Sequence, residues 1–138
     1  MSETRATYDP QRYYSELLHS ITEQDVYDVL KYMRFHIGEG HQISLKDLAI
    51  TAFGEFNDSI ERKTRKCLEI LVTDYHVPIG AYSGKAGRWI CASAEEVERV
   101  AADLESRVQS TNDRIAALRR IPLPYREPER AAQRGLWG

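Results

Sequence analysis

The feature that most constrains the fold is a helical pattern that begins near residue 57 and is broken by a proline at residue 78. Asn57 and Asp58 are residue types that accept hydrogen bonds from the free amide groups of a first helical turn. Glu61 stands three residues after Asp58, where a capping-box carboxylate would lie. Pro78 ends the helix, because proline disfavours a helical conformation in the residue before it. Residues at helical spacing predict one buried face: Ile60, Thr64, Cys67, Leu68, Leu71 and Tyr75.

Two short segments after this helix are typical of paired strands. Residues 78–82 and 88–92 carry apolar and aromatic side chains, and they flank the loop of residues 83–87. Gly84 and Gly87 permit the positive backbone angles that a tight hairpin needs. The sequence therefore predicts a β-hairpin directly after the helix. The fold class predicted for the chain is mainly α with a small β-hairpin (α+β).

Cationic side chains gather on this predicted helix and hairpin. Four of them fall largely outside the apolar face of the helix, and two more lie in or beside the hairpin loop: Arg62, Lys63, Arg65, Lys66, Lys85 and Arg88. A helix fits the major groove of duplex DNA, and a ribbon tip can follow the backbone or enter the minor groove. This arrangement favours double-stranded DNA as a partner. The alternative is a solvated face, because Glu61 and Glu69 can pair with Arg65 and Lys66 at helical spacing.

The composition limits how such a protein can use DNA. The chain has 138 residues, enough for one domain with extensions, and its formal net charge is −2. Charged residues make up 29% and hydrophobic residues 42%, as in a globular protein. A slightly acidic chain does not coat nucleic acid indiscriminately, so any DNA contact must come from local clusters of cations. Without a signal peptide or a membrane-spanning stretch, we expect a cytoplasmic protein with no membrane partner.

The residues that usually carry chemistry are scattered in this sequence. Cys67 and Cys91 lie on predicted buried faces and form no C-x-x-C pair, so we expect two small core residues. The histidines do not pair with one another or with carboxylates at metal-binding spacing, and residues 84–87 are too short for a phosphate-cradling loop. We therefore expect no enzyme activity, no cofactor and no metal site.

The chain before residue 57 predicts an N-terminal arm over residues 1–21, with a short helical turn near its end, and then two helices. Thr22 and Asp25 suggest a cap for a helix whose apolar residues recur at three and four: Val26, Val29, Leu30, Met33 and Ile37. Residues 42–43 suit one short strand, and Ser44 suits the cap of a second helix that Gly54 ends. That helix and the basic one, joined by a glycine-containing turn, predict a helix-turn-helix.

The order helix, strand, helix, helix, strand, strand over residues 22–92 resembles a winged helix-turn-helix domain. More narrowly, residues 43–49, Pro78-Ile79-Gly80 and the run from Gly87 to Ser93 are similar to small phage and prophage proteins of this family. The resemblance implies DNA binding in replication or in transcription regulation, in a bacterial or phage-infected cell. Under this interpretation the residues that face the major groove are Ser59, Arg62, Lys63 and Lys66. The residues that hold phosphates are Ser44, Lys46, Lys85 and Arg88.

A long helix follows over residues 93–121, opened by the capping-box pattern Ser93 to Glu96. Spacings of four and three alternate along it at Val97, Ala101, Leu104, Val108, Thr111, Ile115 and Leu118, which is a heptad seam. We predict a coiled coil that forms a homodimer through Leu104, Val108, Thr111, Ile115 and Leu118, and that sets the separation of two DNA half-sites. The alternative is one amphipathic helix packed on its own domain.

Residues 122–138 begin with three prolines in seven residues and predict a flexible tail. Near its end, Gln133, Leu136 and Trp137 resemble the short peptide by which bacterial replication and repair proteins dock on the sliding clamp. Arg134 departs from that pattern, since leucine is usual at its position. The resemblance implies a second function, in which the tail binds a sliding clamp or another replisome protein. The competing interpretation is that Trp137 folds back onto the long helix or a dimer mate.

Overall fold

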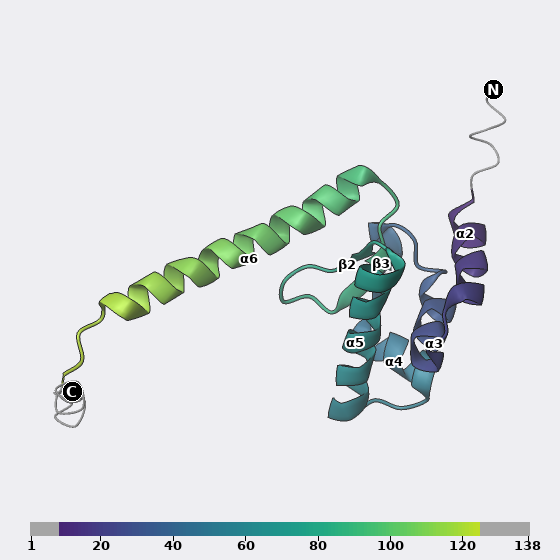
Figure 1. Cartoon of the computed structure of the whole chain (residues 1–138), viewed down its shortest axis with the longest axis horizontal. Helices are drawn as coiled ribbons and strands as arrows, with labels where there is room; N and C mark the ends of the chain where they lie inside the picture. The colour runs from purple at the N-terminus through teal and green to yellow at the C-terminus, as the bar shows by residue number, and fades with distance from the viewer. Residues whose placement is uncertain (1–8, 125–138) are drawn as a thin grey trace. The chain divides into compact units, whose positions relative to one another are not determined.

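The computed structural model describes residues 9–124 and is mainly helical, with a small antiparallel sheet (Figure 1). The predicted order of elements over residues 22–92 is confirmed. In chain order the elements are α2 (Pro10–Leu17), η1 (Leu18–Ser20), α3 (Gln24–Met33), η2 (Glu39–His41), β1 (Ile43–Ser44), α4 (Leu45–Phe53), α5 (Asp58–Tyr75), β2 (Ile79–Gly80), β3 (Gly87–Ile90) and α6 (Ala94–Arg120).

The core lies where α3, α4 and α5 pack on one another, with the sheet beside α5 (Figure 1). Each of these helices contributes fully buried apolar side chains: Val29, Leu30, Met33, Leu48 and Leu71. Strand β3 adds Ile90. The short helix α2 and the residues after it also join this core through Tyr14, Leu18 and Ile21. The compact unit therefore includes residues before 22, and it extends to Glu105.

The sheet has three strands in the order β1-β3-β2, all antiparallel. Ile43 of β1 lies opposite Arg88, and Ile79 of β2 lies opposite Ile90. The predicted hairpin is confirmed, although its strands are shorter than residues 78–82 and 88–92. The sequence left β1 as a single strand without a partner, because two residues carry too little pattern to indicate a pairing.

Gly80 in β2 is required by its neighbour across the sheet. A Cβ atom built on Gly80 would lie 2.5 Å from Cε2 of Trp89, whose side chain is 1% exposed. Tyr82 packs on the same indole, with ring centroids 5.2 Å apart. The absence of a side chain at Gly80 thus lets the large Trp89 ring pack directly against the backbone of β2.

The basic helix α5 begins as its sequence predicts, with one difference. Asn57 is the cap, and its Oδ1 accepts a hydrogen bond of 2.8 Å from the Ile60 N–H. Glu61 does not close a capping box; its carboxylate accepts from Arg65 at 2.9 Å, one turn along the helix. Glu61 therefore partly offsets the charge of Arg65 and does not cap the helix.

The start and end of α3 differ from the prediction. The cap is Glu23, which makes no side-chain hydrogen bond to the helix, and Thr22 donates only to the Glu23 carboxylate. Asp25 lies inside the first turn, where a carboxylate interacts favourably with the helix dipole. Ile37 lies beyond the helix, where its backbone forms a parallel bridge with Ile90.

Helix α6 begins with the predicted cap and is anchored to the preceding loop. The Glu96 N–H donates to Ser93 Oγ at 3.2 Å, and Glu96 Oε1 accepts from the Ala92 N–H at 2.9 Å. Glu96 Oε2 accepts from the Glu39 N–H at 3.1 Å. The hydrogen bonds from Ala92 and Glu39 lower the pKa of Glu96. The first turn of α6 is therefore held by a charged side chain that bonds two different loops.

Within residues 9–124, the structure contains no helix with the length and apolar character that a bilayer crossing requires.

His76, at the end of α5, is a non-glycine residue with left-handed backbone angles, φ 59° and ψ 37°. The Val77 N–H closes the helix end by donating to the Leu71 carbonyl at 2.9 Å. Because an L-residue pays for this conformation and glycine does not, His76→Gly should raise the free energy of unfolding by about 0.5–1 kcal/mol in urea denaturation. His76→Ala keeps the Cβ atom and should give no gain. A less stable glycine variant would contradict this account.

Candidate nucleic-acid interface

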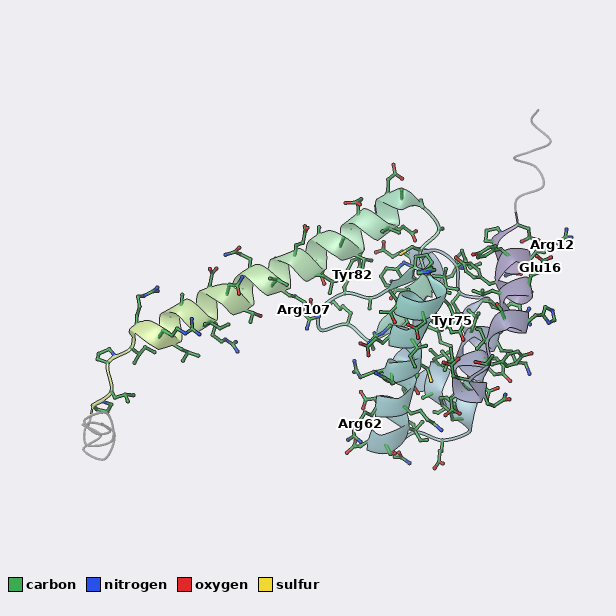
Figure 2. All side chains as sticks on the ribbon, in the orientation of Figure 1. Arg12, Glu16, Arg62, Tyr75, Tyr82 and Arg107 are labelled. Atoms are coloured by element: carbon green, nitrogen blue, oxygen red, sulfur yellow. The ribbon has the colours of Figure 1, made fainter. Side chains whose placement is uncertain are left out.

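The outward face of α5 presents cations to solvent. Arg62 lies near the N-terminal end of this helix (Figure 2), and it pairs with no carboxylate among the residues that the structure describes. Lys66 is 68% exposed and lies 3.8 Å from Glu69. Ser59 is also exposed, in the first turn. These three predicted contact residues are accessible on one element.

Three other predicted contact residues make contacts within the protein. Lys63 Nζ lies 3.6 Å from the Asp25 carboxylate of α3 and 4.3 Å from the ring centroid of Phe53 in α4. Lys46 Nζ lies 6.0 Å from the ring centroid of Phe56. The Ser44 hydroxyl accepts from the Asp47 N–H at 3.0 Å and caps α4. Lys63 thus joins α5 to α3 and α4, and Ser44 has a structural role.

In the hairpin, the two predicted cations differ. Lys85 is exposed at the loop, whereas Arg88 is half-buried. Arg88 Nη1 donates to the carbonyl oxygens of Lys85, Ala86 and Gly87 at 3.2, 3.0 and 3.1 Å. Burial, and then the nearby charge of Arg65, lower the pKa of Arg88. Arg88 therefore organises the hairpin loop from inside.

The hairpin tip is also held by α6. Asp103 Oδ2 accepts from the Ser83 N–H at 3.0 Å and from the Ser83 hydroxyl at 2.8 Å. One turn earlier, Arg99 donates to the Glu39 carboxylate at 3.1 Å. Sequence reasoning missed these contacts, because partners 20 and 60 residues apart leave no local pattern.

A groove of about 240 Å³ runs between α5 and the sheet. Its lining combines apolar side chains with two arginines and one carboxylate: Leu68, Val72, Ile79, Ala81, Arg65, Arg88 and Glu69. Arg65 belonged to the predicted set of outward cations but not to the predicted contact residues. The structure places it beside Arg88, where the basic helix meets the hairpin.

The ion pairs proposed as the alternative to DNA binding are present. Arg65 pairs with Glu61, and Lys66 pairs with Glu69. Both pairs are solvent-accessible, and such pairs contribute at most about 1 kcal/mol. Phosphate oxygens can therefore replace these carboxylates at small cost. The pairs reduce the positive charge of the face without removing its cations.

The seam residues of α6 are accessible to a partner. Leu104 is 49% exposed, Val108 58%, Ile115 40% and Leu118 61%, and Thr111 is exposed as well. The tail residues Gln133, Leu136 and Trp137 lie outside the described residues. No group of histidine, cysteine, aspartate or glutamate side chains within residues 9–124 is arranged to hold a metal ion.

Comparison with protein-family models, curated proteins and solved structures found no match for this chain.

The contacts of Arg88 predict a structural cost for its removal. Arg88→Met keeps the apolar length of the side chain but loses the hydrogen bonds to the Lys85, Ala86 and Gly87 carbonyls. Because hydrogen bonds from a charged donor are strong, we expect the free energy of unfolding to fall by about 1–3 kcal/mol in urea denaturation. The matched control is Lys85→Met, which removes an exposed cation of the same loop and should change stability little. Equal stabilities of the two variants would exclude this role for Arg88.

Proposed function

We propose that this chain is a winged helix-turn-helix protein of phage or mobile-element type, which binds double-stranded DNA as a homodimer. Its role would lie in DNA replication or transcription regulation. The order of α3, β1, α4, α5, β2 and β3 supports this proposal. The observation that carries it is the outward row of cations on α5, with the hairpin flanking the same helix along one groove. In this arrangement α5 is the recognition helix and the hairpin is the wing.

The contacts suggest that some of these cations bind DNA and others stabilise the fold. Arg62 and Lys66 are the side chains best placed to enter the major groove, with Ser59 beside them in the first turn. Lys85 is accessible at the wing and suits a phosphate contact. Lys63 serves the packing of α5, and Arg88 serves the wing. Specificity would thus depend on few free cations, as the net charge of −2 also requires.

The two faces of α6 favour a dimer over packing of the seam on its own domain. The side chains that hold α6 on its domain are polar and follow one another at spacings of three and four: Glu96, Arg99 and Asp103. None of these three residues belongs to the apolar seam, and the seam residue Leu104 beside them is 49% exposed. A surface of this kind on one long helix suits a second copy, because identical seams interdigitate in a coiled coil.

The DNA proposal predicts a loss of binding when two free cations of α5 are removed together. We expect Arg62→Ala with Lys66→Ala to weaken binding of a mixed-sequence duplex at least about tenfold in a mobility-shift assay, and to reduce its salt dependence. The matched control is Arg12→Ala with Lys31→Ala, which removes two exposed cations from α2 and α3. If both double variants bind as the unchanged protein does, α5 carries only a solvated face and the proposal fails.

The dimer proposal predicts that a charge in the seam separates the subunits. Val108→Glu places a carboxylate in the middle of the exposed seam, where two copies would bring like charges together without water. Light scattering should show a dimer for the unchanged protein and a monomer for this variant at micromolar concentration. Ser106→Glu adds the same charge to the opposite side of α6 and should stay dimeric. A monomeric unchanged protein would contradict the proposal.

A further inference from the structure

The groove between α5 and the wing has an unusual distribution of side chains. Its apolar lining is formed by Leu68, Val72, Ile79 and Ala81. Arg65 of α5 and Arg88 of β3 also line it, so that two arginines share one small hollow. Two cations that share one hollow repel each other, and an anion bound between them offsets that repulsion.

Both guanidinium groups keep donors available. An arginine has five N–H donors in a planar fork. Arg88 uses Nη1 for the wing carbonyls, and its Nε and Nη2 have no hydrogen-bond partner among residues 9–124. Arg65 uses Nη2 for Glu61, and its remaining donors are likewise unpaired within that part of the chain. The pair can therefore donate to an oxygen anion without breaking the contacts that fix Arg88.

The position of Arg88 distinguishes this pair from flexible surface cations. The wing carbonyls hold its guanidinium in place, so little rotamer freedom is lost when an anion binds. Desolvation by the groove and the charge of Arg65 lower the pKa of Arg88, as expected for two cations that share a half-buried site. Glu69 lines the same groove, and Lys66 at 3.8 Å partly offsets its charge.

We propose that Arg65 and Arg88 together bind a single backbone phosphate of duplex DNA at this groove, with the apolar lining residues against the adjoining deoxyribose. The inference rests on the proposed function and deepens it, because it names one phosphodiester site between the recognition helix and the wing. Arg88 then has two roles, since it shapes the wing and contacts the phosphate. Arginine suits this position better than lysine, because its fork meets two phosphate oxygens at once.

The test removes Arg65, because its loss leaves the wing intact. Arg65→Gln breaks one exposed ion pair with Glu61, four residues away on the same helix. Arg12→Gln is the matched control: it breaks the exposed pair of Arg12 with Glu16, also four residues apart, on α2 (Figure 2). The affinity of each full-length variant for a mixed-sequence duplex is measured by fluorescence anisotropy over a range of salt concentrations.

We expect Arg65→Gln to weaken binding about three- to tenfold near physiological salt and to reduce the slope of log K against log salt by about one. Arg12→Gln should keep the affinity and slope of the unchanged protein, and both variants should keep its circular dichroism spectrum. If Arg62→Ala with Lys66→Ala loses binding while Arg65→Gln matches Arg12→Gln, the phosphate site is overturned and the proposed function stands. If the unchanged protein binds no duplex, both are overturned.

Discussion

The rest of the structure depends on β3 and its hydrogen bonds to both sides. The Ile90 N–H donates to the His36 carbonyl at 2.8 Å, and the Ile90 carbonyl accepts from the Gly38 N–H at the same distance. The Cys91 N–H donates to the Pro78 carbonyl at 2.8 Å. One strand thus secures the loop after α3 and the chain that leaves α5. Side chains of α5, β2 and β3 line one groove beside this strand.

Successive side chains of β3 point to opposite faces of the sheet, and the two faces make different contacts. Arg88 and Ile90 point to the side of α5, where Ile90 completes the core and Arg88 lines the groove. Trp89 points to the other side, where it packs against Gly80 and Tyr82. The position of Arg88, which holds the hairpin loop, is therefore fixed by the buried Ile90 two residues away. A shift of β3 by one residue would take Ile90 out of the core and turn Trp89 toward α5.

The parts of the fold that were predictable are those with local signals. The cap at Asn57, the helical period of α5, the break at Pro78 and the glycine-containing loop were all visible in the sequence, as was the cap of α6 at Ser93. The pairing of β1 with β3 was not, because two residues have no readable period. Nor were the contacts that decide the candidate site. Charge and spacing do not tell whether Lys63 meets a phosphate or Asp25, and only the folded chain brings Arg65 beside Arg88.

The stability of helix α6 links the proposed dimer formation to the proposed DNA binding. Its first turns hold Glu39 and the wing residue Ser83 through Glu96, Arg99 and Asp103, and its seam carries the surface proposed for the second subunit. An exposed helix is marginal on its own, and a partner that binds only the helical form stabilises it by mass action. Under the proposed function, dimer formation therefore strengthens the helix that holds the tip of the wing. The polar residues and the seam residues occupy different positions on α6, so the helix can contact its own domain and a second subunit at the same time.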